Sequence, residues 1–382
     1  MRSPIKKRSN LRDVATRSGV SVATVSRVLN TPDKVTTETR TRVEQAITDL
    51  KFVPSAAARA MNRGNSGIVA ALLPTLDNAI YARVVNGLET RFRTDGLSLI
   101  VAQTGDSTDV ELNRARKMID IGAEALIVVG VTHDAGLYDL IERTQRPVVA
   151  ISYYDEASSI PTIGYDNWEA ASVAARHFAV LGHRHVGVLH GTVAGNDRTE
   201  RRLNALAEQE FGIEFTFFEV GVSMAGGLDG IAQIQRAHPE ITGALGLSDV
   251  IAHGALHRLN ALHIRVPDEF SIMGIENLPG SEFTYPQLTS VRLSVEQMGE
   301  LSASAIISWL RTEIRPASAH LPVELVPRGA TAPAPSKPLV GAQTRQSKRA
   351  DKAGLASQPT SDAAQHLPIF SVATVTHGPS QT

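Results

Sequence analysis

The segment 11–30, LRDVATRSGVSVATVSRVLN, has side chains whose types and spacing suit contact with DNA. Small or hydrogen-bonding residues surround one face of its second half; they are Ala23, Thr24, Ser26, Arg27 and Asn30. Such side chains on an exposed helix face allow close approach to a duplex, where bulk would hold the helix away from the base edges. The segment is therefore a candidate nucleic-acid contact.

Two short helices joined by a tight turn would position these side chains. Apolar residues recur at helical spacing from Leu11, and Gly19 interrupts the pattern where a chain reversal needs a residue that tolerates positive φ. Ser21 is a suitable N-cap for the second helix. We assign the apolar face of that helix to Val22, Val25, Val28 and Leu29. A third helix is expected at about 37–50.

The basic charge of the chain is concentrated at its N-terminal end. Residues 1–63 contain 13 Lys and Arg residues against 5 Asp and Glu residues, although the whole 382-residue chain has a net charge of -1. Neutralisation of DNA phosphates requires such a concentration, and counterion release would make binding steeply dependent on salt. An ordinary helical hairpin, which is the default interpretation of an amphipathic pair, does not explain this charge.

Composition excludes several other classes of chemistry. The chain has no cysteine, which rules out disulfides, thiolate catalysis and cysteine-based zinc sites. His183 and His185 flank Arg184 without a third ligand nearby, so we expect no metal and no cofactor. There is no glycine-rich phosphate loop and no nucleophile elbow, so we expect no enzyme. The basic N-terminus lacks an apolar export region, and no apolar run is long enough to span a bilayer, so we expect a cytoplasmic protein.

From Gly67 onward, apolar runs alternate with helical segments. Strands are expected at 68–74, 97–103, 125–130, 147–152, 186–190, 215–220, 244–248 and 271–275. Helices are expected near 79–94, 108–121, 135–144, 170–181, 198–210, 225–238 and 250–262. This alternation predicts two α/β lobes with doubly wound parallel sheets. Ligands of such sheets bind at the carboxyl ends of the strands, which places a site in the cleft between the lobes.

The sequence resembles the lactose-repressor/galactose-repressor family of bacterial transcription regulators. The motifs are DVATRSGVSVATVSRVLN and KVTTETRTRVEQAITDLKFVPSAAARAM, and the likeness continues to about residue 329. It implies base contacts by Val22, Ala23 and Arg27. It implies phosphate contacts by Asn10, Ser21, Thr24, Ser26, Asn30, Thr36 and Thr39. Valine and alanine side chains cannot hydrogen-bond a base, so Arg27 is the only one of the three base-facing residues able to fork onto guanine.

The resemblance also implies a hinge helix within residues 53–66, with minor-groove contacts by Ser55, Ala58 and Met61. Met61 stands where leucine usually wedges into a central base step. A helix of about seven residues is too short to be stable alone, so we expect it to form only when docked on DNA. A plain linker is the alternative interpretation of this segment.

The family's effector domain is periplasmic-binding-protein-like, which implies effector contacts near the strand ends. The matching positions are Asn78, Tyr81, Ser152, Arg201, Ser248, Asp249 and Glu276. Arg201 matches an arginine used against a ligand hydroxyl or carboxylate, and Arg198 or Arg202 could take that role instead. Ser152 and Glu276 both stand where aspartate is common, which favours an acidic ligand such as a sugar acid over a standard sugar. Asp249 and Asn78 could equally be helix caps.

These features predict four parts. They are an all-α helix-turn-helix head at 1–52, a hinge helix and linker at 53–66, an effector and dimerisation domain at 67–330, and a disordered tail at 331–382. Lobe 1 should comprise about 67–163 plus 292–318, and lobe 2 about 164–291 plus 319–330. We expect a ligand-responsive repressor of a carbohydrate or sugar-acid operon, acting at the nucleoid and binding a palindromic operator as a homodimer. The alternative is a solute-binding or sensory module that does not bind DNA.

Overall fold

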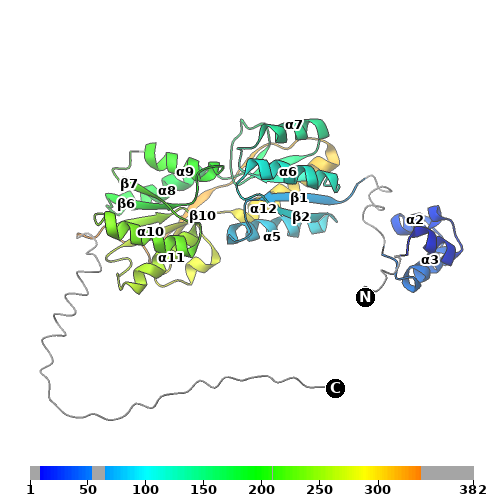
Figure 1. Cartoon of the computed structure of the whole chain (residues 1–382), viewed down its shortest axis with the longest axis horizontal. Helices are drawn as coiled ribbons and strands as arrows, with labels where there is room; N and C mark the ends of the chain where they lie inside the picture. The colour runs from blue at the N-terminus through cyan, green and yellow to red at the C-terminus, as the bar shows by residue number, and fades with distance from the viewer. Residues whose placement is uncertain (1–8, 54–64, 209, 337–382) are drawn as a thin grey trace, which may run out of the picture. The chain divides into compact units, whose positions relative to one another are not determined.

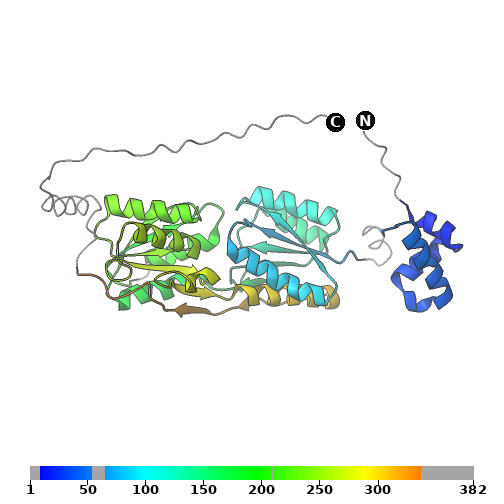
Figure 2. The ribbon, with the colours of Figure 1, turned by 90° about the horizontal axis from the view of Figure 1, so that it is seen from below.

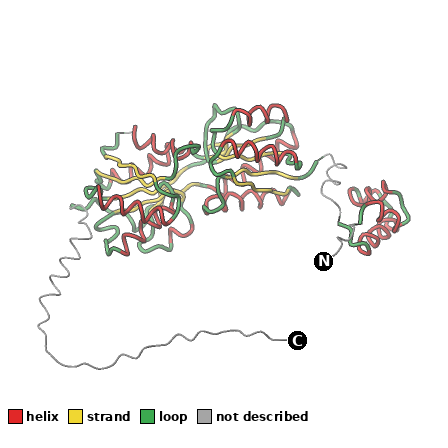
Figure 3. Tube along the Cα trace, viewed as in Figure 1, coloured by secondary structure: helices red, strands yellow, loops and turns green. Residues whose placement is uncertain are grey.

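The computed structural model of the chain describes residues 9–53, 65–208 and 210–336 (Figure 1). A helical head comes first, and two α/β lobes follow from residue 65; their helices, strands and loops are distinguished in Figure 3. No helix within the described ranges is long and apolar enough to cross a membrane. The hinge positions Ser55, Ala58 and Met61 lie outside the described residues, as does residue 337 onward.

The head contains three α-helices and a short 3₁₀ turn. They are α1 (Leu11–Ser18), α2 (Val22–Asn30), η1 (Pro32–Lys34) and α3 (Thr37–Asp49). Gly19 ends α1 in the left-handed region at φ 65°, which makes the tight turn into α2. Val14, Val25 and Val43 are completely buried and bring the three helices together. Val22 is 42% exposed, so its assignment to the apolar face of α2 was wrong. Its position in the first turn points it away from the core.

The first lobe is a six-stranded parallel sheet with the order β11-β5-β4-β3-β1-β2. Its strands are β1 (Ile68–Leu73), β2 (Ser98–Gln103), β3 (Ala125–Val129), β4 (Val148–Ile151), β5 (Thr162–Gly164) and β11 (Ala319–His320). Its helices are α5 (Ala79–Thr94), α6 (Thr108–Asp120), α7 (Ala135–Thr144) and α12 (Val295–Thr312). Figure 2 shows α6 and α7 on one face of the sheet and α5 and α12 on the other. Burial on both faces explains the near-continuous apolar strands.

The second lobe repeats this arrangement with the order β12-β10-β9-β8-β6-β7. Its strands are β6 (His185–His190), β7 (Glu214–Glu219), β8 (Gly243–Gly246), β9 (Ser271–Glu276), β10 (Thr289–Leu293) and β12 (Val323–Val326). Its helices are α8 (Asn167–Val180), α9 (Asp197–Glu208), α10 (Met224–Ala237), α11 (Asp249–Ala261) and the 3₁₀ turn η2 (Pro279–Glu282). Only β12 is antiparallel to its neighbour among the described strands. In both lobes the first strand lies inside the sheet, which opens the carboxyl edge for a ligand.

Two expected boundaries need correction. Ala319–His320 pairs with β5 in the first sheet, so the expected placement of residues 319–330 in lobe 2 is wrong at its start. The expected tail also begins too early, because Ala334 N–H donates to the Leu181 carbonyl (2.8 Å) and Ala332 N–H to Ser271 Oγ (3.2 Å). These backbone contacts hold residues 331–334 on the second lobe. Such hydrogen bonds do not require a periodic pattern of apolar residues, so the hydrophobic pattern of the sequence did not predict them.

Candidate functional site

A cavity of about 170 Å³ lies in the cleft between the two lobes. Lobe 1 contributes the polar side chains of Thr75, Asn78, Tyr81, Asp106, Ser152 and Tyr165. Lobe 2 contributes those of Asn196, Arg198, Thr199, Arg202, Ser248 and Glu276. The cavity has room for roughly a dozen non-hydrogen atoms, at about 10–15 Å³ each. Its lining can therefore hydrogen-bond a small polyhydroxylated molecule from both sides.

The lobes present comparable strained residues at this edge. Ser152 directly follows β4 in lobe 1 and has φ 65°. Glu276 ends β9 in lobe 2 with φ 119°, and Asn277 follows with φ 51°. Residues other than glycine rarely adopt positive φ angles. Such backbone strain tends to be retained at ligand-binding sites. The strained backbone turns the Ser152 and Glu276 side chains into the cavity lining.

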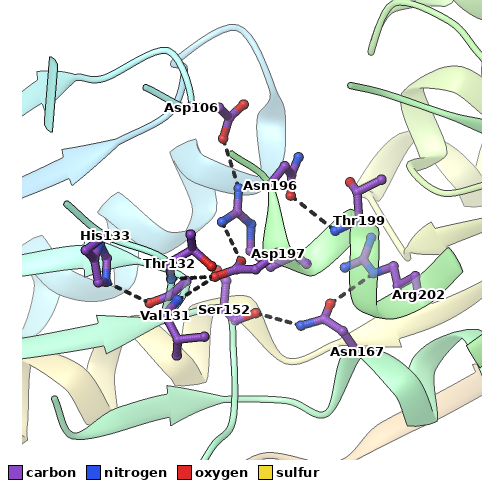
Figure 4. Close-up of polar contacts among 12 residues, drawn as sticks. Asp106, Val131, Thr132, His133, Ser152, Asn167, Asn196, Asp197, Thr199 and Arg202 are labelled. Carbon is purple, nitrogen blue, oxygen red and sulfur yellow. Dashed lines mark hydrogen bonds and ion pairs between the residues drawn. The ribbon is translucent and has the colours of Figure 1, made fainter. Parts of the chain in front are cut away.

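Arg202 is buried and lines the cleft, and its hydrogen-bond acceptors are uncharged (Figure 4). Its Nε donates to Asn167 Oδ1 (2.9 Å) and its Nη1 donates to the Leu247 carbonyl (2.8 Å). Asn167 Nδ2 in turn donates to the Ser152 carbonyl (3.0 Å), which ties the arginine to the end of β4. Because both acceptors are uncharged, the positive charge of Arg202 remains available to a ligand.

Arg201 does not line the cavity, which corrects our preferred assignment. Its side chain is exposed and its guanidinium lies over the Trp168 ring, 4.6 Å from the ring centroid. Arg198 and Arg202 are four residues apart and share one face of α9, whereas Arg201 is rotated by about 100° from Arg202. The matching register was therefore wrong by one residue.

Glu276 is buried in the lining and accepts from Ser248 Oγ (2.8 Å). Burial, followed by the charge of neighbouring Asp249, raises the pKa of Glu276 to about 8. The carboxyl group is therefore mostly protonated at neutral pH. Burial likewise raises the pKa of Tyr81 above its ordinary value. The cleft consequently presents one uncompensated positive group beside largely neutral donors and acceptors.

Asp249 does not line the cavity. It is completely buried and accepts from Leu278 N–H (2.7 Å), Ser281 Oγ (2.6 Å) and Ser290 Oγ (2.6 Å). These bonds fix the loop after Glu276, so Asp249 supports the lining from behind. Nor is it the helix cap considered from the sequence, because Ser248 caps α11.

The other predicted positions of the cleft lie in its wall. Asn78 lines the cavity and also caps α5 by accepting from Ile80 N–H (3.2 Å), so both interpretations of it apply. The sequence did not single out the remaining polar wall residues Thr75, Asp106, Asn196, Thr199 and Tyr165. The first four stand on a loop or helix start after a predicted strand, and Tyr165 directly follows β5.

The histidines near β6 have separate partners. His183 is completely buried and its Nδ1 lies 2.8 Å from Thr242 Oγ1. His185 is instead paired with Glu214. Among the described residues no group of three His, Cys, Asp or Glu side chains is placed to hold a metal ion.

In the head, Val22, Ala23 and Arg27 are all exposed on α2. Some expected phosphate contacts also have roles within the head. Asn10 accepts from Arg12 N–H and Asp13 N–H, Ser21 accepts from Thr24 N–H (3.1 Å), and Thr36 Oγ1 donates to Thr39 Oγ1 (3.0 Å). Ser26 lies on the same helix, and the side chain of Asn30 is outside the description. The capped end of α2 can approach a duplex with these short side chains.

Two family models match the chain. Residues 10–55 match the model described as bacterial regulatory proteins, lacI family. Residues 175–331 match the model described as periplasmic binding protein-like domain. The two matches cover most of the head and most of the second lobe.

Curated relatives and solved structures match over nearly their full length. The HTH-type transcriptional regulator GntR of Escherichia coli strain K12 is 28% identical over 327 residues, covering 85% of this chain and 99% of that protein. The ribose operon repressor of Halalkalibacterium halodurans is 29% identical, covering 85% and 97%. The lac repressor dimer bound to operator and the anti-inducer ONPF is similar in fold, with a TM-score of 0.75 at 22% identity, covering 85% and 100%.

Proposed function

We propose that the chain is a member of the lactose-repressor/galactose-repressor family of bacterial transcription regulators and that it represses a carbohydrate or sugar-acid operon in response to a small effector. The observation that carries this proposal is the combination of parts in one chain. An exposed helix with Arg27 precedes a two-lobed domain whose cleft holds Arg202 and Glu276. DNA readout and ligand binding thus have separate sites that can be coupled.

The head binds operator DNA through α2 in the major groove. Val22 and Ala23 make apolar contacts, and Arg27 forks onto a guanine. The phosphate contacts come from short polar side chains around the two helices. A homodimer presents two heads to a palindromic operator, with Ser55, Ala58 and Met61 of each hinge in the minor groove.

The effector is a sugar or sugar acid, with the acid favoured. Arg198 is compensated by two carboxylates, whereas the hydrogen bonds that Arg202 makes to described residues go to the neutral oxygens of Asn167 and Leu247. With Glu276 mostly protonated at neutral pH, the cavity attracts a carboxylate more strongly than it attracts a cation. Ser152, Thr199 and Ser248 offer hydroxyl groups to the rest of the ligand.

Effector binding changes the angle between the lobes and so the spacing of the two hinges and heads. This coupling needs only a difference in effector affinity between two arrangements of the lobes. The curated relatives are transcription regulators, which supports binding and release of the ligand without a chemical step. The protein acts in the cytoplasm, at the nucleoid, where its DNA partner lies.

Selection from a pool of random duplexes with the full chain tests DNA recognition. We expect enrichment of a palindrome whose affinity falls steeply with salt. Arg27→Ala should cost about 1–3 kcal/mol and relax the preference at one base pair in each half-site. A chain that enriches no sequence is instead a solute-binding or sensory module. Equal losses on specific and random DNA would show that Arg27 contacts only phosphate.

A further inference from the structure

Besides the cavity lining, the lobes meet directly at the start of α9 (Figure 4). Asp197 Oδ2 accepts from Val131 N–H (2.6 Å) and Thr132 N–H (2.9 Å), both in the loop after β3 of lobe 1. Arg198 Nη2 donates to Asp106 Oδ1 of lobe 1 (2.9 Å), and its Nη1 donates to Asp197 Oδ1 (2.9 Å). One charged pair of lobe 2 thus holds two separate loops of lobe 1.

Two of the three charged side chains in this contact are shielded from water. The side chains of Arg198 and Asp197 are 9% and 8% exposed, and that of Asp106 is 37% exposed. Salt screens buried pairs far less than exposed pairs. Loss of one partner would leave a buried charge without compensation, which is costly. Removal of one member of this contact is therefore more costly than removal of one member of a surface ion pair of the same geometry.

The backbone at this contact admits only glycine. Gly130 of lobe 1 has φ 82°, and a Cβ there would lie 2.5 Å from Asp197 Oδ1 and 2.6 Å from Arg198 Nη1. Gly195 of lobe 2 has φ 72°, and a Cβ there would collide with the Asp106 carbonyl oxygen. Each lobe thus supplies a glycine where the other lobe approaches most closely.

Chain connectivity does not impose this contact. The segments that pass between the sheets leave β5 at Gly164, β10 at Leu293 and β11 at His320. None of the residues in the contact lies on those segments. The lobes could separate here without breaking the chain, so the ion pairs and hydrogen bonds must hold them together.

We propose that Asp106, Asp197 and Arg198, with the N–H groups of Val131 and Thr132, form an interlobe latch that keeps the cleft closed without effector. The latch thereby sets the effector concentration at which the protein responds. Asp197 is absent from the cavity lining. It is a positioning residue that acts through the angle between the lobes, and this consequence for the response rests on the proposed function.

Asp197→Asn tests the latch without altering the lining. The asparagine has one acceptor oxygen and one amide, so it cannot serve both Arg198 and the two N–H groups, and it loses the charge. Loss of such a charge-assisted contact should raise the open-to-closed ratio about 10-fold or more. The closed cleft brings both halves of the lining to the ligand. A smaller closed fraction should therefore also raise the apparent effector Kd.

The direct measurement is the distance between spin labels on the two lobes of the effector-free full chain. The chain has no cysteine, so Asp139→Cys on α7 and Ala207→Cys on α9 give two unique labels at exposed positions. We expect a longer or broader distance distribution in Asp197→Asn than in the parent. Arg201→Gln is the matched control, because it removes a charge from the same helix and its guanidinium, which lies over Trp168 of lobe 2, has no part in the latch.

An unchanged distance distribution in a folded Asp197→Asn protein would overturn the latch. If that variant does not fold, Asp106→Ala removes the partner on the more exposed loop and should lengthen the distance in the same way. An unchanged distance distribution in Asp106→Ala would overturn the latch as well. The readout requires neither operator nor effector, so failure of the latch is distinguishable from failure of the proposed DNA-binding function.

Discussion

At the scale of single residues, the assignment of the cleft depended on helical phase. The polar set Arg198 and Arg202 and the apolar set Ala205 and Leu206 fall on the buried face of α9. Arg201 falls outside that face. The sequence contained this periodicity, but Arg201 was chosen from its match to the family's arginine, with Arg198 and Arg202 kept as alternatives, and not from its helical phase. Asp197 had no such signal, because its partners are backbone N–H groups of residues 131 and 132.

Arg202→Met should abolish the response to effector. The variant keeps an apolar stem but loses the buried charge and the bonds to Asn167 and the Leu247 carbonyl. Calorimetric titration with the responding sugar or sugar acid should show affinity reduced at least about 10-fold. Arg201→Met is the matched control and should bind like the parent. Loss of binding only in the Arg201 variant would return the role to that residue.

Glu276 should make the stability of the effector domain depend on pH. Its pKa is raised to about 8 from the ordinary 4.5, so between these values the folded chain holds a proton that the unfolded chain releases. The free energy of unfolding should therefore fall as pH rises through this window, by up to about 1.4 kcal/mol per unit. Urea unfolding of the parent and Glu276→Gln at pH 5.5 and 7.5 isolates this contribution. Parallel pH dependence in the two proteins would exclude it.

At the scale of elements, the alternation of apolar runs and amphipathic segments was sufficient to predict the two sheets. For example, α5 and α7 have the expected bounds at both ends. The short strand β11 was missed because two residues carry no periodicity and are held by pairing with β5. Residues 331–334 were missed for a related reason, since their backbone N–H groups donate to distant acceptors, the Leu181 carbonyl and the Ser271 hydroxyl.

The packing of α12 on α5 depends on two glycines that meet. A Cβ on Gly299 would lie 2.5 Å from the Val84 carbonyl oxygen, and a Cβ on Gly87 would meet the backbone of Glu296. Gly299→Ala should therefore force the helices apart and lower the free energy of unfolding by about 1–3 kcal/mol. Ser308→Ala, at an exposed site of the same helix, should change it by less than about 0.5 kcal/mol. Equal free energies of unfolding for the two variants would show that α12 can move away from α5 at no cost, which would contradict this prediction.

At the scale of the whole molecule, the proposed repressor would bind its palindromic operator as two copies of the chain. Phe283 and Tyr285 are 80% and 90% exposed on the loop after η2 of lobe 2. Large aromatic side chains this exposed are typical of a surface that a partner covers. We expect this loop to be part of the interface of the proposed homodimer. The same loop begins at Glu276 in the cleft wall and is fixed by Asp249, so the interface and the effector site share a support.

Tyr285→Asp should weaken the dimer, because it places a charge in the apolar part of the interface. Sedimentation at micromolar concentration should show a shift toward monomer, and operator affinity should fall with it. Val180→Asp is the control, since Val180 is 85% exposed at the end of α8. Dimers of unchanged stability in the Tyr285 variant would place the interface elsewhere.

The most direct test of the account is the effect of an effector on operator affinity. Thermal-shift screening of sugars and sugar acids identifies the ligand, and fluorescence anisotropy then measures the Kd of the selected palindrome with and without saturating ligand. We predict at least about a 5-fold change in that Kd, which corresponds to about 1 kcal/mol of coupling. The change should disappear in Arg202→Met. An operator Kd that is the same with and without a ligand that binds the cleft would contradict the account.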